Sequence, residues 1–167
     1  MFIYVSGGVR SGKSRYAQTE ALKLAPDPVY IATARIWDED FAERVARHKN
    51  DRGQEWTTFE AYKDISALPL TGRVIVVDCV TLWLSSFFVD TNSDLEAALN
   101  LFKAEIDALY QIDAVFIFIS NELGMGMHAD TELGRKFADL QGWANQYLAN
   151  LADQAYFMVS GIPLKIR

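Results

Sequence analysis

Residues 7–14 read Gly-Gly-Val-Arg-Ser-Gly-Lys-Ser and fit the pattern G-x-x-x-x-G-K-[ST], which limits the possible folds of this chain more than any other feature. The apolar run 2–5 before them is typical of a buried strand, and residues 15–22 after them are typical of a helix. This strand–loop–helix context is the one in which the pattern acts as a phosphate-binding loop. We therefore predict a strand that leads into a nucleotide-binding turn and then into a helix.

The residue types of this loop suit a triphosphate. Glycines allow a tight turn in which several backbone N–H groups point at phosphate oxygens, and the helix N-terminus adds partial positive charge. The Lys13 ammonium can reach the β- and γ-phosphates and is a candidate catalytic group, whereas the Ser14 hydroxyl can bind Mg²⁺. The nucleotide-binding residues expected in the loop are Gly7, Gly8, Val9, Arg10, Ser11, Gly12, Lys13 and Ser14.

Composition narrows the class of protein. The length of 167 residues suits one domain, so we predict that residues 1–167 form a single nucleotide-binding catalytic domain. The net charge of −6 disfavours a nucleic-acid partner, because phosphate backbones attract clustered Lys and Arg. The lone Cys79 cannot form an internal disulfide and favours a cytoplasmic location. No signal peptide is expected, and the apolar stretch 74–89, interrupted by Asp78, is too short for an expected membrane span.

Strand-like and helix-like segments alternate along the rest of the chain. The strong strands are continuous apolar runs, as expected when helices cover both faces of a parallel sheet. We predict an α/β three-layer fold of the P-loop NTPase type with a mostly parallel sheet. The residues Ser93 and Glu96 fit a capping box that opens one helix. Strands are expected at 29–32, 56–59 (weak), 73–78, 114–120 and 154–160, and helices at 38–49, 93–110 and 130–151.

Ligands of such sheets bind beyond the carboxyl ends of the strands, so the residues there are site candidates. Asp78 ends a strong strand and can hold Mg²⁺ together with Ser14, although it could instead cap the next helix. The segment 121–126, Asn-Glu-Leu-Gly-Met-Gly, ends the following strand and is either a ligand-binding loop or an ordinary polar loop. Arg35, after the second strand, could face a phosphate or simply lie on the surface.

His48 is a candidate nucleophile. It shares the apolar stripe of its predicted helix with Phe41 and Val45, so it faces the protein body. An inward histidine is commonly structural, but a neutral imidazole is also a competent nucleophile toward phosphorus. The polar residues 49–52 that follow suit contact with a nucleotide. The residues alone leave both interpretations open.

Taken together, these motifs resemble the bifunctional adenosylcobinamide kinase/adenosylcobinamide-phosphate guanylyltransferase family of cobalamin synthesis. The phosphate loop is common to many kinases, whereas the Arg-His-Lys segment and the Asn-Glu-x-Gly-x-Gly loop, in this order, are far more specific. The resemblance covers nearly the whole chain. The matching segments are residues 6–15, 30–33, 44–49, 77–81, 121–126 and 159–165.

The resemblance implies two reactions in one domain: phosphorylation of adenosylcobinamide, then transfer of GMP from GTP to the product through a guanylyl-histidine. By position His48 is that histidine. The resemblance also implies GTP and ATP as co-substrates, a corrinoid substrate and a homotrimer. Some members carry Glu in place of Asp78 and Gly in place of Pro163, and neither difference removes a needed group. Beyond the phosphate loop, the implied nucleotide-binding residues are Thr33, Ala34, Arg35, Lys49, Asn50, Asp51, Arg52, Glu60 and Asp78.

Two other functions fit the residues less specifically. One is a plain small-molecule kinase in which His48 is structural; the other is a non-catalytic nucleotide-dependent switch subunit. Label from the α-phosphate of GTP would remain on the protein only in the bifunctional enzyme. The segment 82–89 carries more large apolar residues than one helix face needs, so we expect it at a subunit interface.

Overall fold

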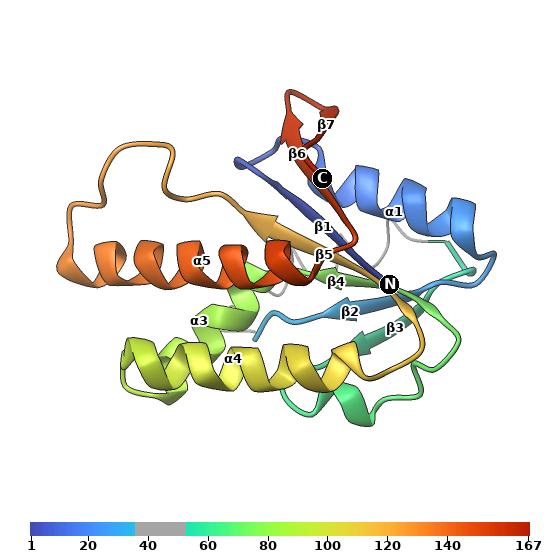
Figure 1. Ribbon diagram of the computed structural model, residues 1–167, viewed down its shortest axis with the longest axis horizontal. Helices are drawn as coiled ribbons and strands as arrows, with labels where there is room; N and C mark the ends of the chain where they lie inside the picture. The colour runs from blue at the N-terminus through green and yellow to red at the C-terminus, as the bar shows by residue number, and fades with distance from the viewer. Residues whose placement is uncertain (36–52) are drawn as a thin grey trace.

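The computed structural model describes residues 1–35 and 53–167, and a seven-stranded sheet lies at its centre (Figure 1). The strand order is β3-β2-β4-β5-β1-β6-β7, with only β7 antiparallel to its neighbour. The predicted mostly parallel α/β fold is therefore confirmed. The strands are β1 (Phe2–Gly7), β2 (Val29–Ala32), β3 (Thr57–Glu60), β4 (Val74–Asp78), β5 (Val115–Asn121), β6 (Gln154–Val159) and β7 (Ile162–Lys165).

Helices cover both faces of the sheet, which gives three layers (Figure 1). One face is covered by α1 (Lys13–Leu24), and the other by α3 (Val80–Asp90), α4 (Leu95–Tyr110) and α5 (Glu132–Leu151). None of the described helices is long and apolar enough to cross a membrane. The predicted helix 38–49 lies outside the described residues.

Side chains that point alternately to the two faces of the sheet explain why the central strands β1, β4 and β5 are almost entirely apolar. In β1, Phe2 and Tyr4 join the core under α3, α4 and α5, whereas Ile3 and Val5 join the core under α1. Successive side chains of a strand point to opposite faces, so a strand covered on both faces has no polar positions to spare. The same division holds for β4 and β5.

The apolar segment 82–89 forms most of α3, and its large side chains are in the core rather than at a surface. Trp83, Leu84, Phe87 and Phe88 are all buried, and among the large ones only Val89 is well exposed. Helix α3 is apolar around most of its circumference because it packs on the sheet, on α4 and on α5. The expectation that this segment forms a subunit interface is therefore wrong for its buried residues.

The capping residue of α4 also differs from the expectation. Asp94 is the N-cap, and its carboxylate accepts a hydrogen bond from the Ala97 N–H at 2.9 Å. Ser93 has a positive φ of 66° and lies one residue before the cap. The capping box of Ser93 and Glu96 is therefore wrong by one position, because aspartate is as good a cap as serine and is one residue nearer the first apolar residue.

Candidate functional site

The phosphate loop follows β1 directly, as predicted, and its backbone requires glycine at two points. A Cβ on Gly7 would lie 2.7 Å from the Met158 carbonyl oxygen, and a Cβ on Gly12 would lie 3.1 Å from the Gly161 Cα. Gly12 also has a φ of 94° and precedes the first residue of α1, so the helix N-terminus opens onto the loop. The loop therefore forms the turn from which backbone N–H groups can hold phosphate oxygens.

Lys13 lies within this turn. Its ammonium donates hydrogen bonds to the carbonyl oxygens of Gly7 at 3.0 Å and Gly8 at 2.6 Å, and only 7% of the residue is exposed. Burial lowers the pKa of Lys13 below its ordinary value, and the nearby Asp78 carboxylate opposes that shift. A phosphate group at the loop would supply the negative charge that this partly desolvated ammonium lacks.

Three side chains meet at the end of β4. The Ser14 hydroxyl donates to Asp78 Oδ2 at 3.0 Å, and the Tyr30 hydroxyl donates to the same oxygen at 2.5 Å. Cys79, not Asp78, is the N-cap of α3, so the alternative capping role of Asp78 is not observed. The oxygens of Ser14 and Asp78 fit Mg²⁺, which is commonly bound by one or two carboxylates together with substrate phosphates.

The turn between β6 and β7 supports the phosphate loop from the other side. Ser160 and Gly161 both have positive φ, as in a two-residue hairpin turn, and the Gly161 N–H donates to the Ser11 carbonyl oxygen at 2.9 Å. The Ser11 hydroxyl is buried and has no hydrogen-bond partner among residues 1–35 and 53–167. Contacts from distant parts of the chain therefore fix the loop, in addition to its own glycines.

The segment after β2 extends past the sheet edge. The Thr33 hydroxyl donates to the Cys79 carbonyl oxygen at 2.8 Å, and Ala34 leads on to Arg35. Arg35 Nη1 lies 3.0 Å from Asp90 Oδ1, and Lys63 also pairs with Asp90. Asp90 is the last residue of α3 and lies about 15 Å along the helix from its first residue, Val80, which closely follows Asp78. The Arg35 guanidinium, which pairs with Asp90, therefore lies well away from Asp78.

Glu60 ends β3 on the same edge of the sheet. It is aligned with Ala32 of β2, which is aligned in turn with Asp78 of β4. Two strand spacings separate Glu60 from Asp78, which is about 10 Å between backbones. The structure thus brings Lys13, Ser14 and Asp78 together and places Glu60 farther along the edge.

The segment Asn-Glu-Leu-Gly-Met-Gly begins beside the phosphate loop. Asn121 is aligned with Gly7, and the Glu122 N–H donates to the Gly7 carbonyl oxygen at 3.1 Å. The Asn121 side-chain amide donates to the Thr81 hydroxyl at 3.0 Å. Residues 122–131 then form a long loop that leads to α5 (Figure 1).

A buried polar cluster lies beneath the start of this loop. The Ser120 hydroxyl donates to Asn145 Oδ1 at 2.6 Å, and Gln141 Nε2 donates to both of these residues at 2.9 Å. The Asn145 amide in turn donates to the Asn121 carbonyl oxygen at 3.1 Å. Buried amides and hydroxyls are costly unless paired, so this cluster fixes where the loop leaves β5.

His48 and the predicted nucleotide-binding residues Lys49, Asn50, Asp51 and Arg52 lie outside the described residues. His128 is described and is exposed in the loop 122–131. Within residues 1–35 and 53–167 there is no group of three or more His, Cys, Asp or Glu side chains that could hold a metal ion. The Mg²⁺ expected here relies on Ser14, Asp78 and the phosphates.

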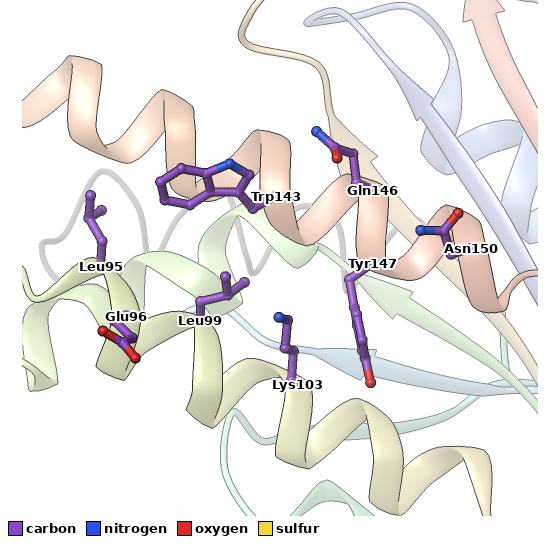
Figure 2. Close-up of a pocket in the computed structure, with 8 residues that line it drawn as sticks. All are labelled: Leu95, Glu96, Leu99, Lys103, Trp143, Gln146, Tyr147 and Asn150. Atoms are coloured by element: carbon purple, nitrogen blue, oxygen red, sulfur yellow. The ribbon is translucent and has the colours of Figure 1, made fainter.

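A groove of about 560 Å³ lies between α4 and α5 (Figure 2). Trp143 and Tyr147 line it from α5, while Leu99 and Lys103 line it from α4. The Lys103 ammonium lies 5.2 Å from the centre of the Tyr147 ring. The lining residues include none from the phosphate loop or the strand ends, so this groove is not the nucleotide site.

No role was predicted for Tyr30, Gly161, Gln141 or Asn145. Tyr30 lies in a run with the appearance of an ordinary buried strand, and its hydroxyl is the only signal of a polar contact. Gln141 and Asn145 are polar residues four apart on the helix face that carries buried Leu140 and Ala144, a spacing that could have indicated a buried polar pair.

Comparison with known proteins agrees with these motifs. The sequence pattern of a family described as cobinamide kinase / cobinamide phosphate guanyltransferase matches residues 3–166. The bifunctional adenosylcobalamin biosynthesis proteins CobU of Escherichia coli and Salmonella typhimurium are 32% and 34% identical to this chain, over 100% of each chain. The bifunctional adenosylcobalamin biosynthesis protein CobP of Pseudomonas aeruginosa is 33% identical over 98% of this chain and 95% of its own.

Proposed function

This chain belongs to the cobinamide kinase / cobinamide phosphate guanyltransferase family, and we propose that it phosphorylates adenosylcobinamide and then converts the product to adenosylcobinamide-GDP. The observation that carries the proposal is the meeting of Lys13, Ser14 and Asp78 at the end of β1 and β4. A buried ammonium beside a phosphate-binding turn suits transfer of a phosphoryl group.

In the first reaction, the γ-phosphoryl of ATP or GTP passes to the side-chain hydroxyl of the cobinamide. The hydroxyl oxygen forms the new P–O bond, the bond from the γ-phosphorus to the β-phosphate oxygen breaks, the nucleoside diphosphate leaves, and the hydroxyl proton passes to water. Lys13 and the loop N–H groups hold the phosphates in line and stabilise the charge that develops on them. Ser14 and Asp78 would hold Mg²⁺, which neutralises phosphate charge when bound.

In the second reaction, an imidazole nitrogen of His48 attacks the α-phosphorus of GTP, and pyrophosphate leaves. A phosphate oxygen of adenosylcobinamide phosphate then attacks the same phosphorus, the P–N bond breaks, and His48 is regenerated. This order of events predicts double-displacement kinetics. We propose that Thr33, Ala34, Arg35, Glu60 and residues 49–52 contribute to this second step, since Thr33 follows β2 and Glu60 ends β3 at the same edge of the sheet.

Labelling tests the covalent step. Protein incubated with GTP labelled at the α-phosphate and then denatured should retain acid-labile label. The chain has two histidines, so the variants His48→Ala and His128→Ala separate them: the first should lose the label and the second should keep it. An unlabelled wild-type protein, or a label that survives His48→Ala, would leave only a cobinamide kinase.

The homotrimer and the cytoplasmic location are part of the same proposal. The trimer rests on the family resemblance, and the location rests on the single, buried Cys79. Sedimentation equilibrium of the pure protein tests the oligomeric state. A monomer at micromolar concentration would contradict the trimer without affecting either reaction.

A further inference from the structure

We propose that Leu123, Met125 and Met127 of the loop 122–131 form the surface that contacts the apolar face of the corrinoid acceptor. These three side chains are called the acceptor surface below. The inference rests on the proposed function, because it names where the substrate of that function binds.

The acceptor surface begins next to the phosphate loop. The Glu122 N–H donates to the Gly7 carbonyl oxygen at 3.1 Å, so the loop 122–131 starts beside the first residue of the phosphate loop. The acceptor hydroxyl must come into line with the transferred phosphorus, which the phosphate loop holds at this edge. A molecule as large as a corrinoid must therefore extend over neighbouring loops, and this loop follows β5, one of the two strands adjacent to β1.

The start of the loop is fixed, whereas its apolar side chains are open to solvent. Asn121 is bound to Thr81 and Asn145, and the Glu122 carboxylate accepts a hydrogen bond from the Gly124 N–H at 2.6 Å. Beyond this turn, Met125 is 78% exposed and Met127 is 95% exposed. A fixed start with open apolar side chains suits a surface that is buried only when a ligand binds.

The chemistry of the acceptor surface matches a corrinoid. Leu123, Met125 and Met127 alternate with Gly124 and Gly126, so apolar side chains are spaced by residues that carry none. Methionine is long and polarisable, and it adapts to irregular apolar shapes. A corrin ring has broad apolar faces and polar amide groups at its periphery. The exposed thioethers suit such a face better than they suit the charged nucleotide.

The test is the double variant Met125→Ser with Met127→Ser, assayed with ATP or GTP and cobinamide. The Michaelis constant for cobinamide should rise about tenfold or more, while that for the nucleotide stays unchanged. Equilibrium dialysis with cobinamide and a non-hydrolysable nucleotide should show the same loss of corrinoid affinity without turnover. The matched control is Leu24→Ser with Leu101→Ser, two exposed leucines on α1 and α4, which should leave both constants unchanged.

Each outcome decides the matter. An active wild-type protein with an unchanged cobinamide constant in the Met125/Met127 variant overturns the acceptor surface and leaves the proposed function intact. If that variant instead lowers the mass in sedimentation without changing corrinoid affinity, the surface belongs to a contact between copies of the chain, and the inference is again overturned. A wild-type protein that does not phosphorylate cobinamide removes both.

Discussion

The phosphate loop and the loop 122–131 follow neighbouring parallel strands, yet they are built in opposite ways. In the phosphate loop, Lys13 and Ser11 are buried, and the Ser11 carbonyl oxygen accepts a hydrogen bond from the Gly161 N–H of the turn between β6 and β7. In the loop 122–131, the side chains beyond Glu122 are mostly exposed. The difference fits two separate roles. The rigid phosphate loop binds the phosphates of the nucleotide, and the exposed loop 122–131 binds the acceptor.

The largest effect of a substitution on activity is expected in the phosphate loop. Lys13→Ala should lower phosphoryl transfer on the order of 10²–10³-fold, because it removes the charge that stabilises the transferring group. The matched control is Lys23→Ala, an exposed lysine in the last turn of the same helix. Initial rates at saturating nucleotide measure the effect, and circular dichroism confirms folding. Retained turnover in Lys13→Ala would contradict the role of the phosphate loop in stabilising the transferring phosphoryl group.

A second prediction assigns different roles to two carboxylates, Asp78 and Glu60, that lie on the same edge of the sheet. Asp78→Asn should raise the Mg²⁺ concentration needed for nucleotide binding by about 10–100-fold, because the metal-binding carboxylate and its hydrogen bonds from Ser14 and Tyr30 are altered together. Glu60→Gln, two strands away, should leave phosphoryl transfer nearly unchanged and lower guanylyl transfer. Titration of nucleotide binding against Mg²⁺ and separate assays of the two steps measure this. Equal losses of phosphoryl transfer would contradict it.

The third effect concerns how the open loop is anchored. Asn145→Ala should lower the free energy of unfolding by about 1–3 kcal/mol, because Ser120, Gln141 and the Asn121 carbonyl lose buried partners. The matched control is Asn150→Ala, an exposed asparagine on the same helix, with a change within about 0.5 kcal/mol. Urea denaturation measures both. If the two variants unfold alike, the start of the loop is not fixed by this cluster.

The parts of the structure that could be predicted are those that a short stretch of neighbouring residues specifies. The phosphate loop and the strands 73–78 and 114–120 were placed correctly, because a short motif or a continuous apolar run specifies each one. The stripe of apolar residues along 130–151 likewise predicted α5. The role of Asp78 as a partner of Ser14 followed from a rule on strand ends, and the structure brings the two residues together.

The parts that were missed depend on contacts between distant residues. Helix α3 was interpreted as an interface because its apolar residues surround it, and only the packing on α4, α5 and the sheet explains this. Strand β7 contains Pro163 and follows Gly161, two residues that usually end a strand, and it exists because it pairs with β6 at the sheet edge. The hydrogen bond from Tyr30 to Asp78 joins residues 48 positions apart, which no local pattern encodes.

The smallest expected effect is a pH dependence of nucleotide affinity that arises at Lys13 of the phosphate loop. Substitutions in the loop 122–131 should not change it. Burial lowers the pKa of Lys13 in the free protein, and a bound triphosphate restores the charged form. Binding therefore takes up a proton at a pH near that lowered pKa, and affinity for a non-hydrolysable nucleotide should fall as the pH rises through it toward the ordinary value of 10.5. One proton limits the fall to about tenfold per pH unit.

Calorimetric titrations in buffers of different ionisation enthalpy measure both the affinity and the proton uptake. Burial raises the pKa of the Cys79 thiol, whose charge would act on Lys13, to about 12, so this thiol stays protonated and does not obscure the titration. Lys13→Ala should bind weakly with a flat profile, and Met125→Ser with Met127→Ser should keep the wild-type profile. A wild-type affinity that stays flat up to about pH 10 would mean that the ammonium is solvated in the free protein, and the contrast between a desolvated turn and an open loop would lose its electrostatic basis.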